Sequence, residues 1–199
     1  MFGLIIIVIA VAYLLLSIAV VKGARRHARN NGKSVARWGW GAALVMYLIP
    51  FWDWLPTVAT HQYYCATEAG FSVYKTPEQW KLENPGVMEG LITNPGVPST
   101  RVGDMENYTD TYFLNERFHW VVRRNGKFLF NRWRKEEEVV DVKTGEVLAR
   151  YVDFSTSQIR RQAGWSGWKF WLDSRHCIDG WDNEGEMGRF EHNFRGTDK

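Results

Sequence analysis

The sequence predicts an α+β protein in which an N-terminal two-helix transmembrane hairpin precedes an antiparallel β-meander domain with one or two short helices. Three observations predict this architecture. Residues 2–21 contain no charged side chain, a second apolar run starts at Trp38, and apolar residues after Thr111 recur with a period of two. The expected segments are a transmembrane helix at 1–22, a basic cytoplasmic loop at 23–37, a second transmembrane helix at 38–56 and an exported domain at 57–199.

The first apolar run has the length of a membrane span. As a helix, residues 2–21 are about 30 Å long, which matches the hydrocarbon thickness of a bilayer. No basic residue precedes this run, and no small-residue cleavage motif follows it. We therefore expect an uncleaved anchor rather than a signal peptide.

The connecting loop is rich in cations and contains no Asp or Glu. Its basic residues are Lys22, Arg25, Arg26, Arg29, Lys33 and Arg37. Because short basic loops resist translocation, we expect this loop in the cytoplasm and both chain ends in the periplasm, in a two-pass protein of a bacterial inner membrane. Outside the loop the chain carries 19 Lys and Arg against 22 Asp and Glu, so the net charge of +3 does not indicate a nucleic-acid-binding domain.

Tryptophans bracket the second apolar segment. Trp38 and Trp40 lie at one end, and Trp52 and Trp54 lie at the other. Indole rings favour the headgroup level of a bilayer, so both pairs are expected interface anchors. Pro50 is expected to kink or end the second helix near the outer interface.

Two cysteines lie near opposite ends of the exported domain. In an oxidising compartment, Cys65 and Cys177 are expected to form a disulfide. Closing a loop of more than 100 residues contributes about 4–5 kcal/mol in the chain-entropy model. The alternative is a zinc site that also uses His61 and His176, but adjacent His and Cys residues are awkward as ligands of one ion. We favour the disulfide and assign no metal or cofactor.

The first half of the exported domain shows signals of short elements. Residues 70–74 predict a strand, and Thr76-Pro-Glu-Gln79 has the form of a capping box that starts a helix. This helix should stop before Asn84-Pro85-Gly86. Residues 94–104, which are rich in Pro, Gly and Ser, predict a loop.

The alternating pattern predicts a meander of about four strands. Phe118, Trp120 and Val122 alternate with more polar residues, and Asn125-Gly126 is a strong hairpin signal. Further strands are expected at 138–142 and 147–154, joined by a turn at 143–146. The acidic segment from Asp179 to Glu186 does not have EF-hand spacing, so we expect a polar tail there.

Two clusters are candidate partner-binding surfaces. One is a basic cluster on the meander, for which ordinary solvation of a sheet face is the alternative. The other is a tryptophan stripe, for which packing in the core is the alternative. The candidate residues are Arg123, Arg124 and Lys127 in the first cluster, and Trp165, Trp168 and Trp171 in the second.

No motif in the chain carries a recognised chemistry. Phosphate-binding loops, zinc-hydrolase motifs and nucleophile elbows are missing from the sequence, so we assign no catalytic residue. The expected function is a periplasmic binding or assembly domain, with membrane lipid and another envelope protein or a second copy as partners. One alternative is a cell-wall glycan hydrolase that uses carboxylates such as Glu116 and Asp141. Another is a subunit of an oligomeric transporter built around Asp53.

Overall fold

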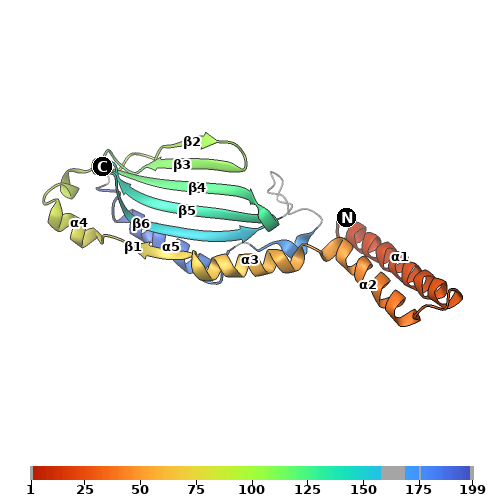
Figure 1. Cartoon of the computed structure of the whole chain (residues 1–199). Coiled ribbons are helices and arrows are strands. Elements are labelled where there is room, and N and C mark those ends of the chain that lie inside the picture. The colour runs from red at the N-terminus through yellow and green to blue at the C-terminus, as the bar shows by residue number, and fades with distance from the viewer. Residues whose placement is uncertain (1, 158–168, 175, 198–199) are drawn as a thin grey trace. The chain divides into compact units, whose positions relative to one another are not determined.

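A computed structural model describes residues 2–157, 169–174 and 176–197. The chain divides into two compact units, Met1–Leu55 and Pro56–Lys199. The described residues form helices and one six-stranded antiparallel sheet, which confirms the α+β class (Figure 1). The meander in this sheet has five strands rather than the four or so expected, and the strand expected at 70–74 is the sixth.

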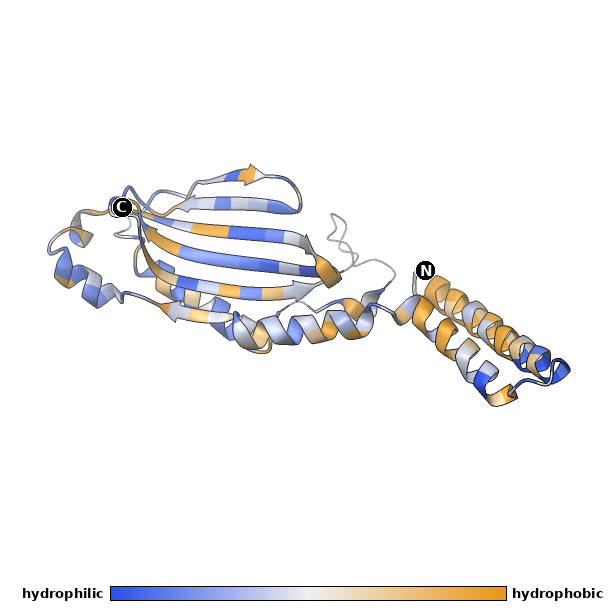
Figure 2. Cartoon of the chain, viewed as in Figure 1, coloured by the Kyte–Doolittle hydropathy of each residue, from blue (hydrophilic) through white to orange (hydrophobic). Residues whose placement is uncertain are grey.

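The first unit contains two helices, α1 (Phe2–Asn30) and α2 (Val35–Phe51). The aliphatic side chains of α1 are exposed. Most of this helix is coloured as hydrophobic in Figure 2. Within the described residues, α1 is the one helix that is long and apolar enough by itself to cross a membrane. It continues eight residues past the expected span, because the Ala and Arg residues of the basic segment favour helix.

Contacts between α1 and α2 join the two helices of this unit. The Tyr13 hydroxyl donates a hydrogen bond to the Met46 carbonyl at 2.5 Å. Gly39 is buried, and a Cβ there would lie 3.0 Å from the Cγ atom of Arg25. The Ser34 side chain caps α2 by accepting a bond from the Arg37 amide. As expected from Pro50, α2 ends one residue later, at Phe51.

A helix that the sequence pattern did not reveal begins two residues before the second unit and continues into it. Helix α3 (Trp54–Thr67) contains Cys65 and reaches the sheet through Tyr64, whose ring centroid lies 5.4 Å from that of Phe154. The predicted capping box forms: Gln79 N donates to Thr76 Oγ1, and Thr76 N donates to Gln79 Oε1. This box starts helix α4 (Pro77–Glu83), which stops before Pro85 as expected.

The six strands form a sheet of order β1-β6-β5-β4-β3-β2, in which β2 to β6 are a meander and β1 pairs with β6. Short 3₁₀ turns lie at Met88–Gly90 and Phe170–Leu172, and a tight turn with left-handed residues lies at Leu129–Asn131. The strands are β1 (Gly70–Val73), β2 (Ser99–Gly103), β3 (Asn107–Phe113), β4 (Phe118–Phe128), β5 (Arg132–Asp141) and β6 (Glu146–Thr156).

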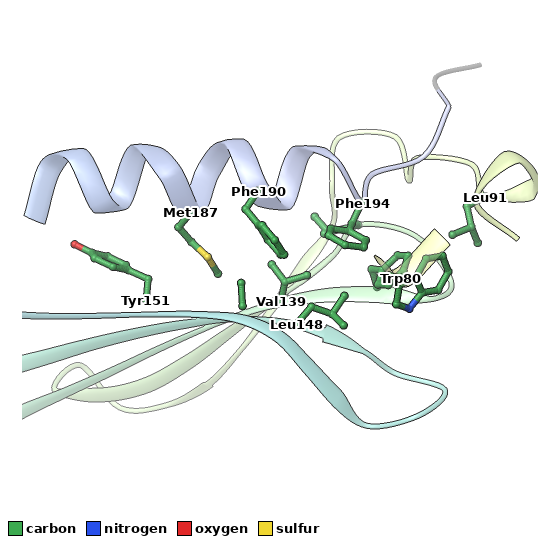
Figure 3. Packing of buried hydrophobic residues seen from close by; sticks show 11 residues of the cluster. Trp80, Leu91, Val139, Leu148, Tyr151, Met187, Phe190 and Phe194 are labelled. Carbon is green, nitrogen blue, oxygen red and sulfur yellow. The ribbon is translucent and has the colours of Figure 1, made fainter. Parts of the chain in front are cut away.

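The core lies between one face of the sheet and helix α5 (Gly180–His192), as Figure 3 shows. Met187 and Phe190 of α5 point toward Tyr151 and Val139, and Phe194 packs edge-on against Trp80 with 6.2 Å between ring centroids. The expectation of a polar tail at 179–186 is therefore wrong. Met187 and Phe190 form an apolar stripe with Phe194, so α5 buries one face although its other residues are polar.

The opposite face of the sheet carries a ladder of charges. Arg123 is paired with Glu138, and Glu136 accepts bonds from Arg134 at 2.7 Å and Arg150 at 2.5 Å. Successive side chains along a strand point to opposite faces, so β5 places these charges on one side and Val139 on the other.

The expected hairpin at Asn125-Gly126 is wrong, because β4 continues through both residues to Phe128, with a shift of register against β5 between Asn125 and Phe128. The chain reverses instead at Leu129–Asn131, where Phe130 and Asn131 have φ values of 62° and 59°. Gly126 serves a different purpose. A Cβ at this position would lie 1.8 Å from the Cζ3 atom of Trp133, so only glycine leaves room for that indole.

The expected loop at 94–104 is wrong in its second half. Residues 99–103 form β2, which pairs with β3 at the edge of the sheet. All five residues of β2 are exposed, which explains why it lacks the alternation of a half-buried strand.

Replacing Gly126 by Ala should destabilise the domain by about 1–3 kcal/mol, because the new methyl group overlaps the Trp133 ring. The control is Gly185→Ala in α5, where no atom lies within 4 Å of the added Cβ. This control should be neutral or stabilising by about 0.5–1 kcal/mol. Urea unfolding of the full chain in mild detergent, followed by tryptophan fluorescence, measures both. Equal stabilities of the two variants would contradict the role assigned to Gly126.

Candidate functional site

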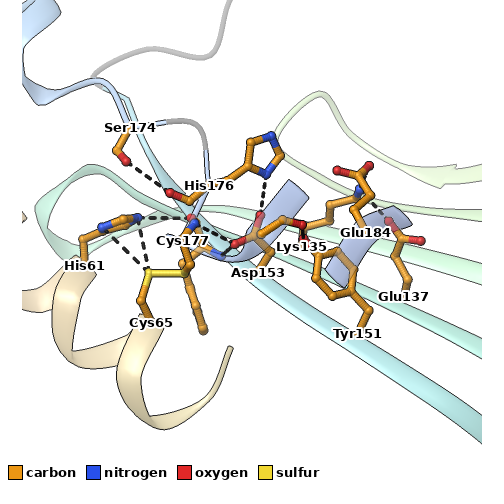
Figure 4. Close-up of polar contacts among 12 residues, drawn as sticks. His61, Cys65, Lys135, Glu137, Tyr151, Asp153, Ser174, His176, Cys177 and Glu184 are labelled. Atoms are coloured by element: carbon orange, nitrogen blue, oxygen red, sulfur yellow. Dashed lines mark hydrogen bonds and ion pairs between the residues drawn. A yellow bond between two sulfur atoms is a disulfide. The ribbon is translucent and has the colours of Figure 1, made fainter. Parts of the chain in front are cut away.

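The predicted disulfide is present. Cys65 of α3 is bonded to Cys177, with 5.5 Å between their Cα atoms and a sequence separation of 112. The bond attaches α3 to the segment that leads into α5 (Figure 4). This segment, rather than the disulfide itself, forms one wall of a pocket.

The four residues considered as a zinc site do not come together as one set of ligands. The Nε2 atom of His61 lies 3.5 Å from the Sγ atom of Cys65, and the two sulfur atoms are bonded to each other. His176 does not join this group, because its ring is hydrogen-bonded to Asp153. Among the described residues, the cysteines therefore form a disulfide next to a single imidazole.

A polar pocket of about 370 Å³ lies beside the disulfide, where β5 begins and β6 ends. Trp133, Lys135, Asp153 and Ser155 alternate along the two strands, and they lie on the sheet face that carries α5. The other walls come from the segment before α5, from the first turns of α5 and from Arg124 of β4. The lining residues from these parts include Asp173, Ser174, His176, Trp181 and Glu184.

The buried Asp153 and the half-buried His176 form a pair in this pocket. The carboxylate of Asp153 is 2% exposed, and its Oδ2 atom lies 2.6 Å from Nδ1 of His176. Its Oδ1 atom accepts bonds from the amides of Phe154 and Cys177 at 2.9 and 3.0 Å. With Nδ1 directed at a carboxylate, a neutral His176 ring carries its proton there and leaves Nε2 as a hydrogen-bond acceptor. Figure 4 shows this nitrogen turned away from Asp153.

A second charge network lies on the same face. Lys135 bridges Glu137 and Glu184, with N–O distances of 2.5 Å to each carboxylate. Tyr151 lies beside this network and donates its hydroxyl proton to the Gly180 carbonyl at 2.9 Å. Burial and the neighbouring carboxylates raise the pKa of Tyr151 far above its usual value. Lys135 and Glu184 are thus already paired, and Tyr151 stays protonated.

The predicted basic cluster is divided by the sheet. Arg123 points to the charged face and pairs with Glu138, whereas Arg124 points to the other face and lines the pocket. Arg124 pairs in register with Lys135, which confirms that the two share a face. The side chain of Lys127 lies outside the described part of the chain. Alternation along β4 separates neighbours that the sequence grouped together.

The tryptophans of the pocket are not those singled out from the sequence. Trp165 and Trp168 lie outside the described residues, and Trp171 is half-buried in the 3₁₀ turn that ends at Leu172. Trp133 and Trp181 line the pocket instead. Trp181 is 65% exposed, and its ring centroid lies 4.3 Å from that of His176. The sequence offers one signal for this contact: His176 and Trp181 are two aromatic residues close together at the start of a mostly polar segment.

The carboxylates considered for glycan hydrolysis do not form a matched pair. Asp141 is fully buried and accepts bonds from Arg117 at 2.6 and 2.8 Å, and from Trp80 Nε1 at 3.0 Å. Glu116 is exposed. Burial raises the pKa of Asp141, but the bonds from Arg117 and Trp80 outweigh it, so the pKa is below its ordinary value. Asp141 is therefore a structural carboxylate.

The four tryptophans expected as interface anchors, and Asp53, lie in α2 or near the break between α2 and α3. Trp38 and Trp40 lie in the first half of α2 and are exposed, as are Trp52 and Trp54 at the break before α3. Asp53 lies in this break and is buried.

Comparison with protein-family models, with curated proteins and with solved structures finds no match for this chain. The function must therefore be argued from the fold and the pocket.

Replacing Asp141 by Asn should cost about 3–5 kcal/mol of stability at neutral pH, because it leaves the buried Arg117 without its counter-charge. The folded-state pKa of Asp141 is depressed, so its contribution is complete above the unfolded pKa of about 4. The contribution is lost as the pH falls below this value toward the folded pKa. The stability gap between wild type and variant should therefore narrow below pH 4 in urea titrations at several pH values.

The matched control is Glu116→Gln, which makes the same change at an exposed neighbour. Its stability should stay within about 0.5 kcal/mol of wild type throughout. An Asp141 gap that does not depend on pH would contradict the assignment.

Proposed function

We propose that this chain is a two-pass inner-membrane protein that displays a disulfide-tied α+β domain in the periplasm as a binding or assembly module. The observation that carries this proposal is the Cys65–Cys177 disulfide. Such bonds form and persist in oxidising compartments and are rare in the cytosol. A bacterial cell that inserts an apolar helix ahead of a disulfide-bonded domain exposes that domain to the periplasm.

The first unit supports the same topology. Its exposed aliphatic surface on α1 suits a hydrocarbon solvent, and water would oppose its exposure. The cations that follow the apolar run favour a cytoplasmic location for the turn between α1 and α2. The second span consists of α2 with the start of α3, since these two helices meet the length and hydropathy criterion only together. The exposed tryptophans near its two ends suit the headgroup layers.

The edge strand β2 supports a protein partner. All of its residues are exposed, and Val102 is 73% exposed. An edge strand presents unpaired backbone groups that accept an added strand from another chain. A second copy paired symmetrically through the middle of β2 would place Arg101 opposite Arg101, and like charges in that position are unfavourable. We therefore assign the edge to an extended segment of another envelope protein.

Topology is tested by fusing alkaline phosphatase, which is active only after export, at two positions. A fusion after Lys199 should be active, and a fusion between Asn31 and Gly32 should be inactive. Replacing the six loop cations by Gln should weaken this difference, because they resist translocation. An inactive fusion after Lys199 in the unmodified chain would overturn the proposed compartment.

The partner surface is tested by photo-crosslinking in cell membranes, with a photoreactive residue in place of Val102. The control position is Ile178, which is 98% exposed and lies outside every strand. A crosslinked species specific to Val102, with a mass different from twice that of the chain, is expected. A species of twice the mass would indicate a second copy instead. Identical patterns at both positions would contradict the assignment of β2.

A further inference from the structure

The pocket beside the disulfide contains polar groups that the fold does not use. Asp153, Lys135 and Glu184 are engaged in the bonds described above. Within the described residues, the guanidinium of Arg124 has no carboxylate in ion-pair contact. In the same part of the chain, Nε2 of His176 has no hydrogen-bond partner. Both groups are half-buried and line the same hollow, so they are available to a ligand that enters it.

The shape and the aromatic wall restrict that ligand to a small ring. A volume of about 370 Å³ lies near the lower end of the range of about 300–1,000 Å³ for small-molecule sites. The indole of Trp181 is 65% exposed at this pocket, although large aromatic side chains are usually buried. An exposed indole offers an apolar face on which the C–H groups of a sugar ring pack.

The polar residues that line the pocket indicate which functional groups the ligand ring carries. Ser155 and Ser157 offer hydroxyl groups, His176 offers an acceptor, and Asp173 is an exposed carboxylate on the same lining. These groups suit the hydroxyls of a sugar, which both donate and accept hydrogen bonds. Arg124 suits one carboxylate, which its planar guanidinium binds with two parallel bonds. Asp173 would repel a multiply charged ligand, so a single negative charge is favoured over a phosphate-rich one.

We propose that this pocket binds one hydroxylated sugar ring that carries a single carboxylate. In this arrangement the ring stacks on Trp181, its hydroxyls bond to His176 and the serines, and its carboxylate pairs with Arg124. The proposal deepens the proposed function, because acidic sugar units of the cell wall surround a domain displayed in the periplasm. The binding chemistry itself depends only on the pocket.

The test uses the purified full chain in mild detergent and titration calorimetry with two probes. N-acetylmuramic acid and N-acetylglucosamine share the pyranose ring and the acetamido group, and only the first carries a carboxylate. N-acetylmuramic acid should bind saturably and about tenfold or more tightly than N-acetylglucosamine, the difference expected for a charge-assisted pair. Absence of saturable binding, or equal affinity for the two sugars, would overturn the proposal.

Two variants separate the parts of the site. Arg124→Ala should reduce the affinity for N-acetylmuramic acid to that of N-acetylglucosamine, and Trp181→Ala should weaken both sugars. Arg123→Ala is the matched control, because Arg123 is the next residue but points to the opposite face of the sheet. This control should bind like wild type, and near-ultraviolet circular dichroism verifies the fold of each variant. Equal loss in Arg123→Ala and Arg124→Ala would overturn the site.

These results are independent of the topology fusions. A chain that fails to bind either sugar can still be exported and engage a protein partner through β2. A chain whose fusion after Lys199 is inactive can still bind the acidic sugar in detergent. The two proposals therefore fail separately.

Discussion

The covalent link between Cys65 and Cys177 is the constraint on which the second unit depends. It joins α3 to a segment that has little regular structure of its own. That segment supplies the Cys177 amide and the His176 ring to Asp153, and it continues directly into α5. Without the link, ordering this segment would cost conformational entropy that its few contacts recover poorly. The pocket wall and the start of the core helix are thus held by the same bond.

The two faces of the sheet follow from the side-chain alternation on β5 and β6. Tyr151, Val139 and Ala149 face α5 and form the core, whereas Glu136, Glu138 and Arg150 form the ladder on the other side. The pocket lies where the core face continues past the start of α5 and becomes polar. The first turns of α5 cover Lys135, which pairs with Glu184, and Asp153, whose Oδ2 atom lies 3.1 Å from the Cβ position of Gly180. Trp133 and Ser155 lie beyond them on the same face. A sheet that is longer than its covering helix therefore creates a site without any special motif.

Much of the fold could be predicted from local signals. The capping box at Thr76–Gln79, the turn after Asp141 and the pairing of the two cysteines each depend on residues whose chemistry allows few alternatives. The prediction failed at Asn125-Gly126, where the same dipeptide that favours a tight turn instead leaves space for Trp133. The prediction failed again at α5, because the apolar stripe of this helix has few residues. The stripe can be recognised only from its packing on Tyr151 and Val139. Tertiary packing decided both cases.

The candidate site was harder to predict, because its members come from four separate segments. Arg124, Lys135 and Asp153 lie on three different strands, and neither their spacing nor their identity marks them as a group. The sequence indicated the importance of His176 only through its neighbour Cys177. Arg123 and Arg124 are equivalent in the sequence, but the alternation of side chains along β4 places them on opposite faces of the sheet.

The order of the two cysteines along the chain has a consequence for biogenesis. Cys65 emerges from the ribosome 112 residues before Cys177, a delay of roughly 6–20 s at ordinary rates of synthesis. All six strands, from Gly70 to Thr156, are synthesised within this interval, before Cys65 has its partner. Maturation of the domain is therefore coupled to completion of translation, and a truncated chain that ends before Cys177 would leave Cys65 without its partner.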